Sequence, residues 1–133
     1  MIVWDNGYSV NIVELDNQHK QLFKLANDLE TAMREGRGNV VLGRIFDELV
    51  DYTARHFARE EELMAGHGYP DYEEHKRKHD AMVEKVLQLK DQAGGGQAGL
   101  TIKTMDFLAN WLNKHIKGTD KEYSAHLNAK GVK

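Results

Sequence analysis

Hydrophobic residues recur every three or four positions over most of the chain, which is the spacing of one face of an α-helix. No segment alternates with the two-residue period of a β-strand. Four long helices separated by short connections favour an all-α fold, an antiparallel up-down-up-down four-helix bundle with an N-terminal arm and a short C-terminal helix. The pattern places the helices over residues 17–35, over 40–65, from 70 to the glycine-rich stretch 94–99, from 101 to 118, and in a tail at 121–128.

Local signals set the expected helix ends. Asp16 is a predicted N-cap of the first helix, and Gly36 and Gly38 are predicted to end it. Pro70 suits the first turn of the third helix, and Gly118 interrupts the fourth. We therefore expect a single domain over residues 1–133, divided into an arm at 1–15, a bundle at 17–118 and a tail at 119–133.

Polar side chains interrupt the apolar stripes at one end of the predicted bundle. In an up-down-up-down bundle, the starts of odd-numbered helices and the ends of even-numbered helices share one end. Histidines or glutamate occupy all four of these places: His19, then His56 and Glu60, then His75 and His79, then His115. Burying several imidazoles and a carboxylate without partners would cost several kcal/mol. A hydrogen-bonded polar core would satisfy them, but five imidazoles at one level favour metal, and five exceed what one ion needs. Imidazole suits iron, zinc, copper or nickel, and a mixed imidazole and carboxylate set suits iron well.

Composition narrows the setting of this site. The chain has 133 residues, no cysteine, and a formal charge of −3 from 18 basic and 21 acidic residues. This mild acidity argues against a nucleic-acid-binding surface. No apolar run approaches the roughly 18 residues of a membrane span, and the N-terminus lacks the basic start and apolar stretch of a signal peptide. The sequence predicts a cytoplasmic protein with no membrane span, and a monomer because no large apolar patch is evident.

Four motifs resemble those of a known family. They are "LDNQHKQLF" around His19, "HFARE" from His56 to Glu60, "HKRKH" from His75 to His79, and "HIKGTD" from His115 to Asp120. In this order and spacing the sequence resembles the hemerythrin family, most closely its single-domain bacterial form, bacteriohemerythrin. The resemblance covers essentially the whole chain, including "MAGHGYPDY" between the second and third helices.

The resemblance implies a role for each residue of the cluster. His75, His79 and His115 would be the terminal ligands of one iron, and His19 and His56 those of the other. Glu60 and Asp120 would bridge the two irons. Helical spacing alone does not find Asp120, because five residues after His115 it would point about 140° away on a regular helix. A kink or helix end at Gly118 would swing it back, and its alternative role is an ordinary N-cap of the tail helix.

A count of ligands then predicts where O₂ binds. Two six-coordinate irons offer about twelve positions, of which five histidines, two bridging carboxylates and one oxo or hydroxo bridge leave one open. The resemblance implies two iron ions with such a bridge, and O₂ as a ligand at the position beside only two histidines. Six apolar residues close to the ligands in sequence are predicted to wall an O₂ pocket, their alternative role being plain bundle core: Leu22, Phe23, Phe57, Trp111, Leu112 and Ile116.

The leading prediction of function is reversible O₂ binding for oxygen storage, transport or delivery, without enzyme activity. An oxygen-consuming enzyme would then be the recipient. A sensor of O₂ or redox state is an alternative, although a chain that begins at Met1 without room for an output module favours a free-standing protein. A di-iron enzyme, such as a peroxidase or a nitric oxide reductase, is the other alternative.

Overall fold

The computed structural model describes residues 2–36, 39–93 and 98–133, and within these ranges all regular structure is helical. A short 3₁₀ turn, η1, lies in the N-terminal arm, and a π-helical segment, η2, joins α4 to α5. The elements in chain order are η1 (Asn6–Tyr8), α1 (Val13–Arg34), α2 (Asn39–Gly66), α3 (Tyr72–Ala93), α4 (Ala98–Lys114), η2 (His115–Asp120) and α5 (Lys121–Ala129). The predicted fold, an all-α bundle with an arm and a short C-terminal helix, is confirmed.

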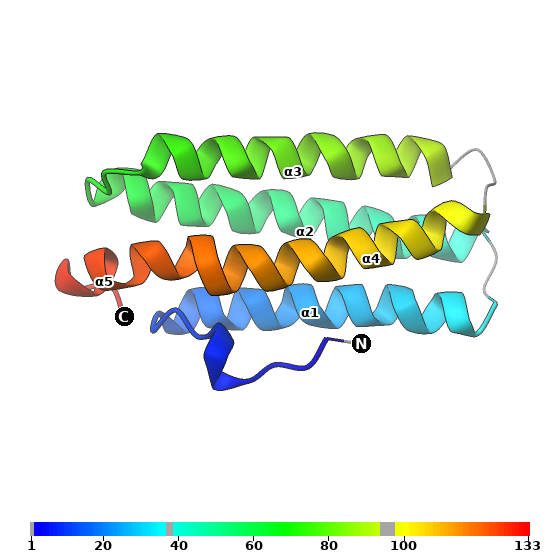
Figure 1. The fold of residues 1–133 in the computed structure, drawn as a ribbon, viewed down its shortest axis with the longest axis horizontal. Coiled ribbons are helices and arrows are strands. Elements are labelled where there is room, and N and C mark those ends of the chain that lie inside the picture. The colour runs from blue at the N-terminus through cyan, green and yellow to red at the C-terminus, as the bar shows by residue number, and fades with distance from the viewer. Residues whose placement is uncertain (1, 37–38, 94–97) are drawn as a thin grey trace.

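The four long helices lie side by side, and successive helices run in opposite directions (Figure 1). α1 packs against α2 and α4, and α3 packs against the same two helices. α5 and the turn between α2 and α3 lie at the same end of the bundle (Figure 1). No helix in the described part of the chain is both long and apolar enough to cross a membrane.

Two apolar clusters form the core. The larger one fills the space between the four long helices, and the smaller one lies around α5 and the residues just before α1. α1 passes from Leu15 in the smaller cluster, through buried His19, to Leu22 in the larger one. Each fully buried apolar side chain of this kind contributes about 1.5–3 kcal/mol. The polar residues therefore occupy a layer held between two apolar layers.

The first helix begins earlier than predicted. α1 starts at Val13, its N-cap position is Ile12, and no side chain caps it there. Asp16, predicted as the N-cap, instead lies in the first turn and accepts hydrogen bonds from the Val10 backbone N–H at 2.8 Å and the Ser9 hydroxyl at 2.6 Å. Through these two hydrogen bonds its carboxylate fastens the arm to the helix. The arm accordingly ends at residue 12 rather than 15.

Two other predicted helix ends were also displaced. α3 begins at Tyr72, so Pro70 lies in the preceding turn rather than in the helix. Gly68 in that turn has φ +66°, a conformation that a residue without a Cβ adopts at low cost. α4 begins at Ala98 rather than 101. Of the predicted glycine-rich loop, residues 94–97 lie outside the described residues, as does Gly38.

Candidate metal centre

All seven predicted site residues come together inside the bundle, and each is at most 5% exposed. They form two groups that share Asp120, and within each group one nitrogen or oxygen atom per residue lies within 4.8 Å of the others. The three-histidine group consists of His75, His79, His115 and Asp120. The two-histidine group consists of His19, His56, Glu60 and Asp120.

Helical spacing places most of these side chains. α2 carries His56 and Glu60 four residues apart, and α3 carries His75 and His79 at the same spacing. Residues four apart lie on one helix face with Cβ atoms about 6 Å apart, so each pair points to a common region. α1 supplies His19 from its second turn.

The π-helix η2 explains the position of Asp120. Its six residues run from His115 to Asp120, and its hydrogen bonds join residues five apart rather than four. Residues five apart therefore lie on nearly the same face, so His115 and Asp120 both point inward. Asp120 also occupies the N-cap position of α5, but its side chain makes no capping hydrogen bond. The predicted kink near Gly118 is thus a wider helical turn, and the alternative capping role is not the one that the side chain adopts.

The two carboxylates each reach histidines of both groups. Asp120 Oδ1 lies 3.0 Å from His75 Nε2 and 2.9 Å from His115 Nε2, while Oδ2 lies 3.1 Å from His19 Nε2. Glu60 Oε1 lies 2.8 Å from His56 Nε2 and 3.5 Å from His79 Nε2. Both carboxylates therefore lie between the two groups of histidines, within reach of each.

The cluster does not satisfy itself by hydrogen bonding. Eight of its buried side-chain atoms have no hydrogen-bond partner among the described residues: His19 Nδ1 and Nε2, Glu60 Oε1, the Nε2 atoms of His75, His79 and His115, and both carboxylate oxygens of Asp120. The N···O approaches are short, but these atoms form no hydrogen bonds among the described residues. Buried polar atoms are normally paired. Lone pairs that converge without pairing fit a set of metal ligands and contradict the alternative of a hydrogen-bonded polar core.

Two histidines are held from behind by polar side chains. His56 Nδ1–H donates to Gln18 Oε1 at 2.6 Å, and His79 Nδ1–H donates to Glu61 Oε2 at 2.9 Å. A neutral imidazole carries one N–H, so this bond leaves the Nε2 lone pair directed at the cluster. Sequence reasoning missed Gln18 and Glu61. They are neighbours of His19 and Glu60 in the chain, and no spacing rule distinguishes them from other polar surface residues.

Tyr123 from α5 makes a direct polar contact with the cluster. Its fully buried hydroxyl donates to Glu60 Oε2 at 2.5 Å. Burial, together with the negative charges of Glu60 and Asp120, raises the pKa of Tyr123 well above its ordinary value. The phenol therefore keeps its proton and serves as a fixed donor.

The electrostatics prepare most of the cluster for binding a cation. Burial would raise the pKa of Asp120, but His115 and the other imidazoles hold it well below its ordinary value. Glu60 behaves alike, because His56 and His19 outweigh burial and the repulsion from Asp120 and lower its pKa. Burial lowers the pKa of His79 to about 3. Two ionised carboxylates and a neutral imidazole are therefore present at neutral pH, in the forms that bind metals.

His19 differs from His79 in its electrostatics. Burial alone would lower its pKa, but the carboxylates of Asp120 and Glu60 outweigh burial and raise the pKa to about 10. Without a cation in the cluster, a proton on His19 offsets part of the negative charge of the two carboxylates.

Aromatic rings cover the three-histidine group. Phe57 stacks on His79 with ring centroids 3.8 Å apart, and Trp111 stacks on His115 at 4.1 Å. Tyr123 lies against His75 at 5.5 Å. Of the predicted pocket wall, Trp111 is half-buried and the other five residues are buried in the larger apolar cluster. Phe57 and Trp111 thus lie against the three-histidine group, whereas the prediction placed the open position beside the two-histidine group.

A four-helix bundle that encloses histidines and shared carboxylates defines a metal-binding bundle as a class of protein. Within that class, residues 10–127 match the family model of the hemerythrin HHE cation binding domain. The chain belongs to the hemerythrin family, which supports a non-haem iron domain that binds O₂.

Similar proteins agree over most of their lengths. The chain is 37% identical to a bacteriohemerythrin of Stenotrophomonas maltophilia, over 96% of this chain and 85% of that protein. It is 34% identical to a bacteriohemerythrin of Methylococcus capsulatus, over 92% of each. A crystal structure of wild-type hemerythrin superposes with a TM-score of 0.89 at 32% identity, covering 96% of this chain and 98% of that one.

Proposed function

We propose that this protein binds O₂ reversibly at a non-haem di-iron centre and serves in oxygen storage, transport or delivery. The observation that carries the proposal is the unequal division of the cluster. Three imidazoles gather in one group and two in the other, and Asp120 belongs to both. If both Glu60 and Asp120 were shared by a pair of ions, the ion at the two-histidine group would have one imidazole fewer, which favours that ion as the place for an external ligand.

Each residue of the cluster has a role in this proposal. His75, His79 and His115 would hold one iron, His19 and His56 would hold the other, and the carboxylates of Glu60 and Asp120 would be shared by both. Gln18 and Glu61 fix the orientation of two of the imidazoles. When bound, the iron pair would supply the two electrons of reversible O₂ binding.

The surroundings of the cluster favour binding over turnover. Five imidazoles and two carboxylates carry less negative charge than the glutamate-rich sites of ferritin-like bundles, so they stabilise high-valent iron less. Leu22, Phe23, Leu112 and Ile116 are at most 4% exposed and exclude water from the bundle interior. We propose these four, with Phe57 and Trp111 covering the three-histidine side, as the apolar wall that encloses the O₂ pocket, and an oxygen-consuming enzyme as the recipient.

Absorption spectroscopy tests the proposal directly. The chain is loaded with Fe(II) without oxygen, exposed to O₂, purged with argon and exposed again. We expect a charge-transfer band that appears with O₂, disappears on purging, and returns over several cycles. Asp106→Asn removes one carboxylate from the exposed face of α4. It is the matched control for Asp120→Ala, which removes one carboxylate from the cluster.

Two results would count against the proposal. A band that forms once and cannot be reversed would indicate oxidation of the centre, and would favour a redox sensor or an enzyme. Rapid turnover of peroxide or nitric oxide by the iron-loaded chain, abolished by Asp120→Ala, would favour a di-iron enzyme.

A further inference from the structure

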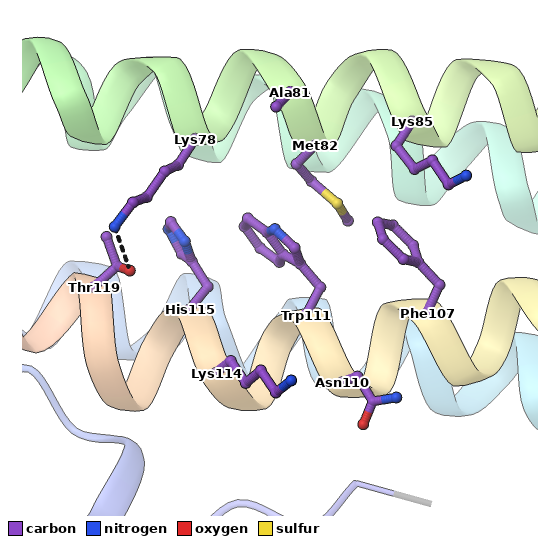
Figure 2. A pocket seen from close by; sticks show the side chains of 10 residues that line it. All are labelled: Lys78, Ala81, Met82, Lys85, Phe107, Asn110, Trp111, Lys114, His115 and Thr119. Atoms are coloured by element: carbon purple, nitrogen blue, oxygen red, sulfur yellow. Dashed lines mark hydrogen bonds between the residues drawn. The ribbon is translucent and has the colours of Figure 1, made fainter.

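A groove on the surface between α3 and α4 lies outside the metal centre. Its volume is about 550 Å³, within the range of small-molecule sites. Figure 2 shows side chains from both helices pointing into it, Lys78, Met82 and Lys85 from α3 and Phe107 and Trp111 from α4. Of the seven residues of the metal centre only His115 lines this groove, so the groove lies beside the centre and not inside it.

The groove is positively charged although the chain as a whole is acidic. Lys78, Lys85 and Lys114 line it, and no carboxylate does, in a protein of formal charge −3. Within the described part of the chain, none of the three ammonium groups forms an ion pair. Lys78 Nζ donates only to Thr119 Oγ1, at 3.4 Å. On the neighbouring exposed face of α3, by contrast, Lys76 pairs with Asp80 at 3.1 Å.

Aromatic rings separate the two lysines of α3. In Figure 2, His115, Trp111 and Phe107 stand in a row along α4, with Lys78 beside one end of the row and Lys85 beside the other. Lys85 Nζ lies 6.0 Å from the centroid of the Phe107 ring. Flat apolar faces between two cations match a ligand with a planar apolar body and a negative group at its edge.

We propose that this groove binds a small planar anion, namely an aromatic or conjugated ring system that carries a carboxylate, sulfonate or phosphate group. The ring would lie on Trp111 and Phe107, and the anionic group at its edge would meet Lys85 at the Phe107 end of the row, while Lys78 and Lys114 add positive charge around the groove (Figure 2). The inference goes beyond O₂ binding and stands whether or not the chain carries oxygen.

The occupant of the groove would contact the metal centre through one residue. Trp111 stacks on His115 with an angle of 13° between the rings, and His115 Nε2 lies 2.9 Å from Asp120 Oδ1. His115 itself lines the groove. A ligand ring that packs on Trp111 would therefore act, through the stacked rings, on a residue of the three-histidine group. The groove would in this respect be a regulatory site.

Titration calorimetry on the iron-loaded chain of 133 residues tests the proposal. The probe is naphthalene-2-sulfonate, and the neutral comparison is naphthalene-2-methanol. Lys85→Gln/Lys114→Gln removes two cations of the groove. Lys130→Gln/Lys133→Gln removes two exposed lysines from the C-terminal end and is the matched control.

We expect one sulfonate per chain, binding about tenfold more tightly than the neutral compound. The groove variant should lose about tenfold in affinity, as two exposed charge interactions would predict, and the control variant none. The absorption of the iron centre should shift at saturating probe. Absence of binding, or equal affinity for the neutral compound or for the groove variant, would overturn the binding site. An unchanged spectrum at saturation would overturn the link to the metal centre.

Discussion

The two groups of the metal centre differ in what surrounds them. Rings of Phe57 and Trp111 stack on two imidazoles of the three-histidine group, at 3.8 and 4.1 Å. Among the described residues no ring stacks on an imidazole of the two-histidine group: Phe57 is tilted against His56 at 6.0 Å, and His19 meets His56 edge-on at 4.6 Å. The partner behind His79 is the carboxylate of Glu61, whereas the partner behind His56 is the neutral amide of Gln18.

This difference indicates that the two groups have different roles. The three-histidine group is covered by rings and backed by a charged hydrogen bond, which suits a position with no room for a further ligand. The two-histidine group has one imidazole fewer and is backed by a neutral bond, which suits the position at which we propose that O₂ binds. Four changes test this comparison, from the largest expected effect to the smallest.

Removal of the carboxylate of Asp120, which both groups share, should abolish the difference between the two groups. Because Asp120 belongs to both groups, Asp120→Ala should weaken both iron positions, each by about a hundredfold or more, since even outer-sphere partners are worth 10–100-fold. Iron content after anaerobic loading and desalting should fall from two per chain to less than one. Asp106→Asn should retain two. Retention of two irons by Asp120→Ala would show that Asp120 is not a ligand.

Truncation of the apolar wall should act on stability and on oxygen chemistry together. Leu112 is 4% exposed, and Leu112→Ala should cost about 2–5 kcal/mol in the free energy of unfolding. It should also speed autoxidation of the oxygenated protein, because water reaches the centre. Leu29 belongs to the same apolar cluster and lies farther along α1 than His19, away from the metal centre. Leu29→Ala should lose similar stability without faster autoxidation. Equal autoxidation rates in the two variants would remove Leu112 from the wall.

Glu61 and Gln18, the hydrogen-bond partners behind His79 and His56, allow each group to be weakened separately. Glu61→Ala and Gln18→Ala should each weaken one iron position by about 10–100-fold. The effect of Glu61 should be larger because its hydrogen bond is charge-assisted. Release of iron to a chelator should become biphasic in both variants, with half of the iron leaving faster. Glu62→Ala and Asn17→Ala, at exposed neighbouring positions, are the controls. Uniphasic release in both variants would mean that the groups are not separable.

The smallest effect is expected from an exposed ion pair between α1 and α2, the helices that carry the histidines of the two-histidine group. Arg59 Nε lies 2.7 Å from Glu14 Oε2, and this hydrogen bond lowers the pKa of Glu14. A lowered pKa means that the pair stabilises the fold above the ordinary pKa and loses this effect as the pH falls through the lowered one. Glu14→Gln should therefore cost less than about 1 kcal/mol at neutral pH and nothing in strong acid. Glu73→Gln, exposed on α3, is the control in denaturant titrations at both pH values, and a cost that persists in acid would exclude the ion pair as its source.

Most of the centre could be predicted because helices repeat regularly. The pairs His56/Glu60 and His75/His79 follow from four-residue spacing, and up-down topology brings them to the level of His19 and His115. Asp120 could not be found in this way, because nothing local in "HIKGTD" announces a π-helix. Only the resemblance to a family supplied it.

Side chains with two possible uses account for the other differences. Asp16 is a good helix cap by type, but its carboxylate accepts two hydrogen bonds from the arm, and that tertiary contact decided its place. Gln18 and Glu61 are polar residues beside the core stripe. They acquire a role only when the imidazoles of other residues turn toward them, and a single sequence does not show this.

The central claim is that one chain holds two unlike iron positions, of which one accepts O₂. The most direct test measures O₂ uptake by gas titration on protein of known iron content. We predict two irons and one O₂ per chain, with full release of the O₂ under argon. Uptake of two O₂ per chain, or of one O₂ by a chain that holds a single iron, would contradict it.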